Sequence, residues 1–187
     1  GAIPLTRLLT VHRQAQDSSI ISLAHAVKNN HLPDDLRVKK PDRLYVEATH
    51  QQIPVYLKQI VENAISKGYT ANEVQVLVPM YRGDCGIDSL NVMLQEIFNP
   101  PDEQNKREMN ENDDKEEKLI ACFDTKEVTY KKGDLQNLTH AYCVSVHKSQ
   151  GSEYPIVILP MTHAYHVMLQ KKLIYTAITR AKRSLIV

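Results

Sequence analysis

The sequence predicts an α/β domain built on a parallel sheet with helices packed against it. Strand-like apolar runs alternate with amphipathic helical stretches along most of the 187 residues, the order typical of this fold class. The run Val74–Val78 is apolar at four of its five positions, as in strands buried on both faces. A polar stretch, His147–Glu153, separates two more such runs, at 141–146 and 154–159. Ligands of open parallel sheets lie where strands lead into loops, so this stretch is a candidate site.

The first hundred residues contain three strand-like runs and three amphipathic stretches. In the stretch 51–67, apolar residues such as Ile53, Leu57 and Ile60 are three or four positions apart, and Gly68 follows as a helix terminator. The pattern predicts, in order, a strand at 8–11, a helix beginning after an Asp17 or Ser18 cap, a strand at 44–47, a helix at 51–67, the strand at 74–78 and a helix at 88–98.

The middle of the chain interrupts this alternation. Residues 101–118 carry eight acidic and four basic side chains and no large apolar cluster, so we expect a loop or a disordered segment there. A β-hairpin that turns at Asp124-Thr125 follows, and then strands at 141–146 and 155–159, a helix at 171–182 and a strand at 184–187. These patterns divide the chain into a first part of the α/β domain at 1–100, an acidic loop with a small β-rich insert at 101–138, and a second part at 139–187.

Charge is distributed unevenly, although the formal net charge is only +1. Residues 1–100 carry ten basic and ten acidic side chains, whereas residues 119–187 carry nine basic and four acidic ones. A basic final third suits a surface that faces phosphates, but an ordinary solvated surface can have the same composition. No apolar run reaches the roughly 20 residues that span a bilayer, so no membrane partner is expected.

The cysteines and histidines indicate neither a disulfide framework nor a metal site. Three widely spaced cysteines lack any CxxC or Cys/His ligand spacing, and His163 and His166 have no third ligand nearby in the sequence. We therefore expect no metal, a reduced cytoplasmic setting, and a core position for Cys143. His12, beside a predicted strand, is expected to be packed or capping.

Two stretches near the C-terminus carry the functional chemistry. The polar stretch 147–153 offers a cation, hydroxyls, amides and one glycine, which suits a phosphate or a sugar, although a capped polar turn has the same composition. On the predicted helix 171–182, Thr176, Thr179 and Arg180 share one face, where threonines and small apolar residues flank the arginine. Such a face is unusual for an arginine that is merely solvated.

These stretches resemble the late motifs of superfamily 1 helicases. "VHKSQGSEYPIVILP" resembles motif V and "LIYTAITRAK" resembles motif VI, in the right order and spacing. "LLTVHRQAQDSSIISLAHAV" resembles motif IV, with Arg13-Gln14 at its centre. "VQVLVPMYRGDCGIDSLNVMLQEIFNP" resembles a stretch distinctive of the RecD-like branch, the family of the exodeoxyribonuclease V alpha subunit. The resemblance covers nearly the whole chain.

The resemblance implies a second RecA-like motor domain, which closes on a P-loop-bearing first one to enclose ATP with Mg²⁺. By this resemblance Arg180 is the arginine finger that reaches the γ-phosphate, and Arg13 is a second phosphate-sensing cation with Gln14 beside it. Gly151 and Glu153 then lie against the nucleotide, with the carboxylate accepting from ribose hydroxyls. The track for single-stranded DNA comprises Ser145, His147, Lys148 and Ser149, with weaker candidates at Pro79, Met80, Tyr81, Arg82 and Asn91.

The chain departs from a complete motor in two ways. No two of its six glycines are five positions apart, so it contains no GxxxxGK[ST] loop, and its one Asp-Glu pair, Asp102-Glu103, lies in the acidic stretch. We therefore expect the other motor domain to hold most of the ATP and Mg²⁺, and the isolated chain to be inactive. Relatives carry a small β-barrel where 104–118 stands, so a truncated barrel is expected. Gly1-Ala2 resembles a cloning remnant, and we expect the chain to begin inside a larger protein.

The function implied is the C-terminal half of an ATP-dependent DNA helicase or translocase that acts on single-stranded DNA in repair or recombination. The alternative is a non-catalytic nucleic-acid-binding or scaffold module on the same fold. A nuclease is disfavoured because the motif-bearing segments have no clustered carboxylates to hold metal. Whether the parent protein works alone or with other subunits of an exonuclease complex stays open.

Overall fold

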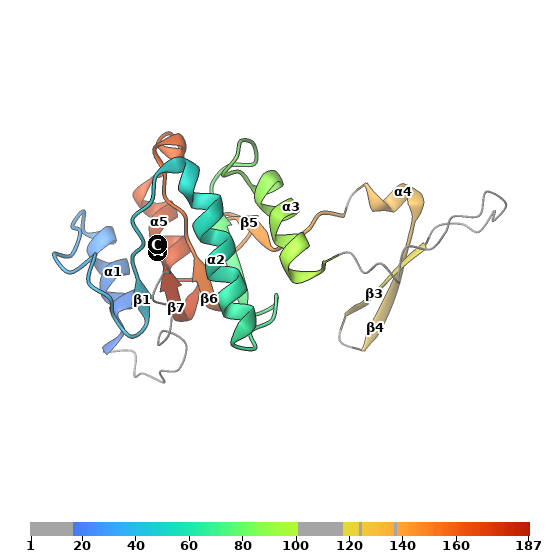
Figure 1. Ribbon diagram of the computed structural model, residues 1–187, viewed down its shortest axis with the longest axis horizontal. Coiled ribbons are helices and arrows are strands. Elements are labelled where there is room, and N and C mark those ends of the chain that lie inside the picture. The colour runs from blue at the N-terminus through green and yellow to red at the C-terminus, as the bar shows by residue number, and fades with distance from the viewer. Residues whose placement is uncertain (1–16, 101–117, 124, 137) are drawn as a thin grey trace. The chain divides into compact units, whose positions relative to one another are not determined.

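The computed structural model describes residues 17–100, 118–123, 125–136 and 138–187 (Figure 1). The chain divides into two compact units, one formed by residues 1–99 with 142–187 and the other by residues 100–141. The strand expected at 8–11, His12, and the Arg13-Gln14 pair lie outside the described residues, as does most of the acidic stretch.

The larger unit is built on a five-stranded parallel sheet, which confirms the predicted RecA-like α/β fold (Figure 1). The strand order is β1-β7-β6-β2-β5, and every neighbouring pair is parallel. The bounds are β1 Arg43–Leu44, β2 Val74–Val78, β5 Cys143–Ser145, β6 Tyr154–Ile158 and β7 Ala181–Ile186.

In the described part of the larger unit, four helices and two short 3₁₀ turns accompany this sheet. Helices α2 and α3 pack on one face and α1 and α5 on the other, giving three layers. None of the described helices is long and apolar enough to cross a bilayer. The bounds are α1 Ser19–Lys28, η2 His50–Gln52, α2 Ile53–Ser66, α3 Ile87–Phe98, η4 His163–Tyr165 and α5 Lys171–Ile178.

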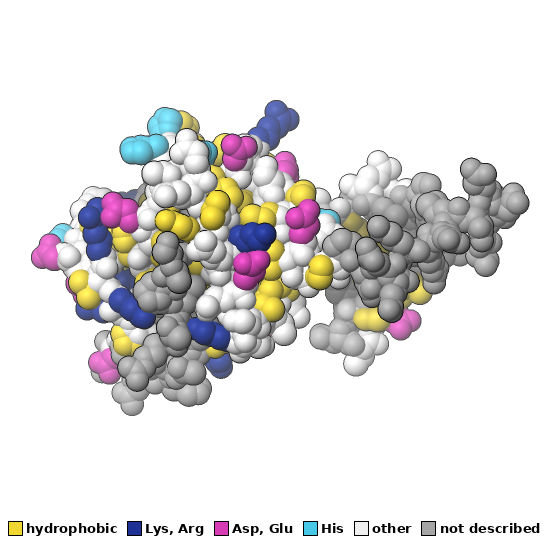
Figure 2. Space-filling view, viewed as in Figure 1, with side chains coloured by type: hydrophobic (Ala, Val, Ile, Leu, Met, Phe, Trp, Pro, Cys, Tyr) yellow, Lys and Arg dark blue, Asp and Glu magenta, His cyan; other side chains and the backbone are white. Residues whose placement is uncertain are grey.

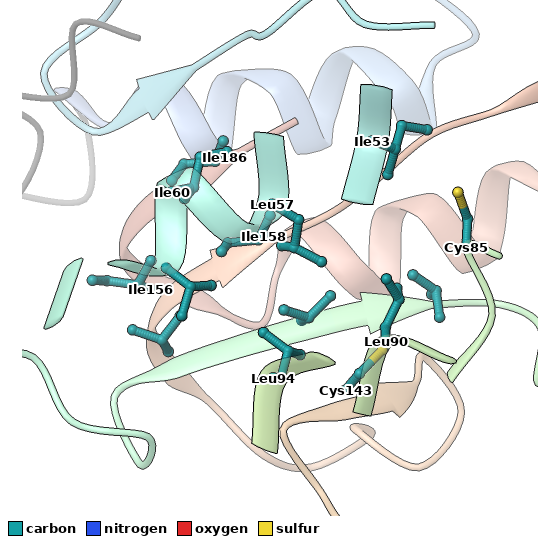
Figure 3. Close-up of a cluster of buried hydrophobic side chains, with 14 of the residues drawn as sticks. Ile53, Leu57, Ile60, Cys85, Leu90, Leu94, Cys143, Ile156, Ile158 and Ile186 are labelled. Atoms are coloured by element: carbon teal, nitrogen blue, oxygen red, sulfur yellow. The ribbon is translucent and has the colours of Figure 1, made fainter. Parts of the chain in front are cut away.

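Two apolar cores follow from the alternation of side chains along the central strands. Ile156 and Ile158 of β6 join the core under α2 and α3, together with Leu57 and Leu90 (Figure 3). Val157, between them, joins the core under α1 and α5. A strand that buries both faces reads as a nearly continuous apolar run, which is why the sequence indicated a parallel sheet.

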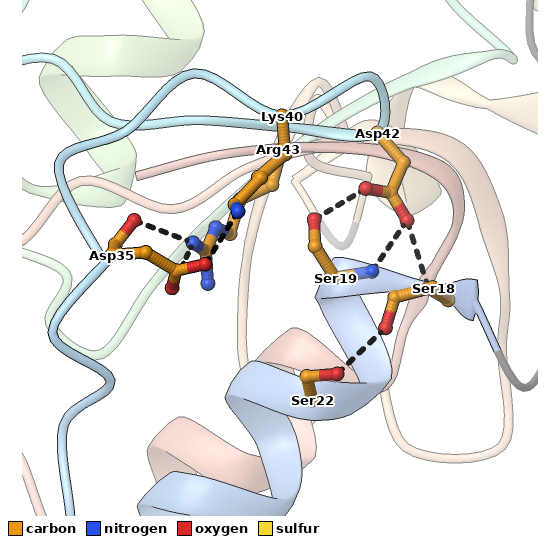
Figure 4. A network of polar contacts seen from close by, with 7 residues as sticks. All are labelled: Ser18, Ser19, Ser22, Asp35, Lys40, Asp42 and Arg43. Carbon is orange, nitrogen blue, oxygen red and sulfur yellow. Dashed lines mark hydrogen bonds and ion pairs between the residues drawn. The ribbon is translucent and has the colours of Figure 1, made fainter.

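A polar network joins α1 and the segment before β1 to the sheet (Figure 4). Asp42 is buried and accepts hydrogen bonds from Ser18 Oγ at 2.9 Å and from the Ser19 backbone N–H at 3.0 Å. Arg43, only 1% exposed, donates to the Asp35 carbonyl at 2.9 Å and to its carboxylate at 3.1 Å. Of the two caps proposed for α1, Ser18 is the correct one, because its hydroxyl accepts from Ile21 N–H at 3.4 Å.

The C-terminal helix is shorter than predicted. Helix α5 ends at Ile178, and Thr179 and Arg180 form a turn that leads directly into β7. Strand pairing outweighs the helical propensity of this segment, since β7 is an inner strand bonded to both β1 and β6. Arg180 and Lys182 therefore do not lie on a helix.

The smaller unit contains the predicted hairpin. Strand β3, Lys118–Phe123, pairs antiparallel with β4, Lys126–Lys131, and a short helix α4 follows at Lys132–Leu135. Among the described residues of this unit the two strands pair only with each other, so a closed barrel is not part of what the structure describes.

Asn91 completes the edge of the sheet. Among the strands that the structure describes, β5 has a neighbour on one side only, and on its other side lies the buried Asn91 of α3. Its Nδ2 donates to the Cys143 carbonyl at 2.8 Å, and its Oδ1 accepts from the Cys143 N–H at 2.8 Å. Asn91 was a weak candidate for DNA contact, but its amide is engaged inside the fold. Cys143 is fully buried in the core, as predicted.

Replacing Asn91 by alanine is expected to destabilise the larger unit by about 2–4 kcal/mol, because a buried N–H and a buried carbonyl lose their partners. Urea unfolding of the 187-residue chain measures the change. Glu96→Ala, at an exposed position of the same helix, is the control and should shift stability by less than about 0.5 kcal/mol. Equal stability of Asn91→Ala and the unchanged chain would show that the edge of β5 is satisfied in another way.

Candidate functional site

A groove of about 750 Å³ lies at the carboxyl ends of β2 and β5. Five of the nine residues predicted for the DNA track line it, from two separate segments of the chain: Pro79, Tyr81, Ser145, His147 and Lys148. The sheet brings these segments together because β2 and β5 are parallel neighbours, with Val78 paired to Ser145.

Two hydrogen bonds stabilise the turn after β5, and the side chains of His147 and Lys148 stay exposed to solvent. The Lys148 N–H donates to Ser145 Oγ at 3.2 Å, and Ser149 Oγ donates to the Val146 carbonyl at 2.7 Å. His147 and Lys148 are exposed, whereas Ser149 has no exposed surface. The prediction that Ser149 contacts DNA needs correction, since its hydroxyl is turned inward and stabilises the turn.

The loop between β2 and α3 sets the position of Tyr81. It folds back on the helix start, where the Asp88 N–H donates to the Tyr81 carbonyl at 3.1 Å. Only glycine fits at position 86, because a Cβ there would be 2.4 Å from the Tyr81 carbonyl oxygen. Tyr81 is 45% exposed, and Lys148 Nζ lies 5.8 Å from the centre of its ring. Met80 packs against the core, and Arg82 is exposed beside the groove lining without being part of it.

The opposite segment of the groove lining was not predicted from the sequence. Helix α5 begins with Lys171 and Lys172, has no acidic residue in its first turn, and is capped at Gln170 without a side-chain hydrogen bond. The positive end of the helix dipole therefore faces two cations, an arrangement that a nearby anion would offset. The lysine pair just before the motif VI segment was the available signal. This segment contributes Val167, Met168, Gln170, Lys172, Leu173 and Thr176 to the groove.

Arg180 lies at the other end of α5. Its Nη1 donates to the Ser152 carbonyl at 3.0 Å, its Nε to the Thr176 carbonyl at 3.2 Å, and its Nη2 to Thr179 Oγ1 at 3.4 Å. The guanidinium thus lies between the end of α5 and the segment that contains Gly151 and Glu153. The threonines flank Arg180 as the sequence suggested, although a turn and not a helical face brings them there.

Glu153 is charged and partly exposed. Its Oε2 lies 2.9 Å from Lys182 Nζ, and both side chains are more than half exposed. This contact lowers the pKa of the Glu153 carboxyl below its ordinary value, and the charge of Arg180 acts in the same direction. Gly151 has φ of +82°, and nothing lies within 4 Å of the position where a side chain would begin. Arg180, Gly151 and Glu153, predicted separately for the nucleotide, are therefore neighbours.

The two sets of residues lie at opposite ends of the strands and are joined by two segments. The groove lies at the carboxyl ends of β2 and β5, whereas Glu153 and Arg180 directly precede the amino ends of β6 and β7. Residues 146–153 run from one end to the other. Helix α5 does the same, since Thr176 lines the groove and its carbonyl accepts from Arg180.

The buried thiols and the histidines do not form a comparable site. Burial raises the pKa of the Cys85 and Cys143 thiols, which disfavours the reactive thiolate. His50 contacts Thr162 Oγ1 through Nδ1 at 2.9 Å, which accounts for one of its ring nitrogens. In the described part of the chain, no three His, Cys, Asp or Glu side chains are grouped so as to hold a metal.

Removing the Lys182 charge is expected to raise the pKa of Glu153. Because Lys182 is the main cause of the lowered value, Lys182→Gln should return the Glu153 carboxyl toward an ordinary glutamate. The stabilising contribution of the pair is present above that ordinary pKa and is lost as pH falls through the lowered one. NMR titration of the Glu153 carboxyl measures both states. Lys171→Gln, at the other end of α5, should leave this pKa unchanged, and identical titrations of all three proteins would exclude the contact in solution.

Comparison with known proteins supports one family. Residues 140–187 match the family described as UvrD-like helicase C-terminal domain. Over 209 aligned residues the chain is 29% identical to the ATP-dependent RecD2 DNA helicase of Deinococcus radiodurans. The aligned region covers 97% of this chain and 28% of that protein. A 54-residue segment is 44% identical to an uncharacterized protein of Methanocaldococcus jannaschii, covering 29% of this chain and 5% of that protein. The chain thus spans less than a third of the length of either relative.

Proposed function

We propose that this chain, which is a C-terminal domain of a RecD-like helicase, supplies half of an ATP-dependent motor that moves on single-stranded DNA. In this proposal ATP binds between it and a P-loop-bearing motor domain of the same parent protein. The observation that carries the proposal is that one helix, α5, both lines a cationic groove and holds Arg180. The proposal also gives the parent protein a role in DNA repair or recombination and an association with further subunits. Both are tested on the parent protein.

The groove has the chemistry of a track for a nucleic-acid strand. Lys148 and Lys172 line it, His147 adds a further polar contact, and Tyr81 offers a partly exposed ring. Lysines and the start of a helix attract phosphates, and an aromatic ring can stack on a base of any sequence. Elsewhere, on the face drawn in Figure 2, basic and acidic side chains are interspersed over the larger unit.

Arg180 is suited to act on a triphosphate. Its three hydrogen-bond acceptors are two backbone carbonyls and a hydroxyl, all uncharged. A charged phosphate is a stronger acceptor for a guanidinium than these oxygens, so the side chain can exchange them for a γ-phosphate. Glu153, whose pKa is lowered by Lys182, can accept from ribose hydroxyls, and the open space at Gly151 leaves room for the nucleotide. Arg13 and Gln14 remain proposed members of this site.

The other motor domain would supply most contacts to ATP and Mg²⁺. The sequence contains no P-loop, and its described residues offer no grouped carboxylates for a divalent ion. Within the parent protein, this chain's contribution is then the finger, the ribose contact and one wall of the DNA track.

Arg180→Ala in the parent protein should lower DNA-stimulated ATP hydrolysis by roughly 10³–10⁵, the usual effect of losing an arginine finger. Arg180→Lys should restore little activity, because an ammonium cannot reproduce the planar fork that binds phosphate oxygens. The measurement is steady-state ATPase with saturating single-stranded DNA, accompanied by thermal melting. Arg183→Ala is the matched control, since Arg183 is exposed on β7 and outside both sites. Hydrolysis by Arg180→Ala within a few-fold of the parent would favour the scaffold function instead.

Lys148→Ala combined with Lys172→Ala should weaken binding of single-stranded DNA and make it less dependent on salt. Each phosphate contact contributes about 0.7 to the slope of log affinity against log salt for single strands. Fluorescence anisotropy at several salt concentrations measures both quantities with the 187-residue chain. Lys58→Ala is the control, because Lys58 lies on α2 and pairs with Glu62. An unchanged affinity and slope in the double variant would exclude the groove as the track.

A further inference from the structure

Val167 and Met168 form an apolar edge of the groove, here called the lip. They are 76% and 49% exposed, and Val167 is the most exposed of the large hydrophobic residues in the described part of the chain. Exposing two adjacent apolar side chains has a cost, and an exposed apolar pair with polar side chains around it is typical of a binding surface. Lys148 and Lys172 line the same groove.

The lip is held by an ordered turn. The Met168 N–H donates to the Tyr165 carbonyl at 2.8 Å, and the Gln170 N–H donates to the Met168 carbonyl at 2.8 Å. Tyr165 is only 1% exposed, and its hydroxyl donates to the Cys85 carbonyl. Leu169, the next residue, packs against the core. The turn is therefore anchored on both sides of the exposed pair, which keeps Val167 and Met168 outside the core.

We propose that Val167 and Met168 contact the nucleobases of the strand in the groove, while Lys148 and Lys172 contact its phosphates. This inference rests on the proposed function of the groove, and it specifies whether the lip and the lysines contact the bases or the phosphates. A single strand presents a charged backbone on one side and apolar base faces on the other, and the groove offers cations and an apolar lip to match. In a duplex the faces of the bases are stacked on one another and are not accessible, so the lip would favour single strands.

The two kinds of contact respond differently to salt and to the chemistry of the strand. Phosphate contacts release counterions and weaken as salt rises, whereas apolar contacts with bases do not depend on counterions. An abasic strand keeps every phosphate and loses every base. The affinity that an abasic strand lacks is therefore the sum of the contributions of the lip and of the Tyr81 ring, and a variant of the lip alone separates the two.

The experiment compares Val167→Ser combined with Met168→Ser with the unchanged 187-residue chain, using oligothymidine and an abasic strand of equal length. The unchanged chain should bind oligothymidine about five- to tenfold more tightly than the abasic strand. The double variant should lose part of this preference, with the remainder due to the unchanged Tyr81 ring, and it should bind the abasic strand with unchanged affinity and keep the same salt slope. Val92→Ser is the matched control, since Val92 is 60% exposed on α3 and does not line the groove. Thermal melting should show all variants folded.

Two results would overturn the inference while leaving the proposed function intact. One is a double variant that binds oligothymidine as tightly as the unchanged chain, the result expected if a protein surface and not a base covers the lip. The other is an unchanged chain that binds both strands equally. If the lysine variants also leave both strands bound as before, then the proposed DNA track fails together with the inference.

Discussion

One backbone hydrogen bond, from the Tyr154 N–H to the Arg180 carbonyl at 2.9 Å, fixes the candidate nucleotide site. It joins the starts of β6 and β7, where Tyr154 pairs with Ala181 before the register shifts ahead of Ile156. Glu153 therefore precedes one strand and Arg180 precedes the other. The ion pair between Glu153 and Lys182 spans the same two strands. Both strands lie in the interior of the sheet, so the apolar side chains packed on its two faces hold the strands in place. Glu153 and Arg180 are therefore positioned mainly by the strands that follow them.

The parallel sheet also explains how the groove and the site around Arg180 are linked. Parallel strands place their carboxyl ends at one edge and their amino ends at the other, so the groove residues that follow β2 and β5 and the residue Arg180 before β7 belong to opposite edges of the sheet. Residues 146–153 and helix α5 run between these edges, and Thr176 belongs to both ends, lining the groove and accepting from Arg180. A shift of α5 on nucleotide binding would move Lys172 and Thr176 together. Packing against the apolar core favours movement of the helix as a unit.

The sequence predicted the sheet, the flanking helices and the approximate sites because these depend on local patterns. Nearly continuous apolar runs indicated the strands, and the spacing of polar residues indicated the turn after β5 and the segment around Arg180. The direction of individual side chains depends on tertiary packing, which is why Ser149 and Asn91 were taken for DNA contacts. In the structure a hydroxyl caps a turn inside the fold and an amide completes a sheet edge. Val167 and Met168 reach the groove only through the course of the chain after β6, which no local pattern specifies, whereas the pair Lys171-Lys172 was a local signal for Lys172.

The link between Arg180 and the groove is tested most directly by the affinity of the parent protein for single-stranded DNA, measured with and without a non-hydrolysable ATP analogue. If α5 joins the two sites, the analogue should change that affinity by about fivefold or more in the unchanged protein. Arg180→Ala should bind DNA normally without nucleotide and lose most of the change that the analogue causes. An equal nucleotide-dependent change in both proteins would contradict the link and would leave the groove and Arg180 as independent features of the domain.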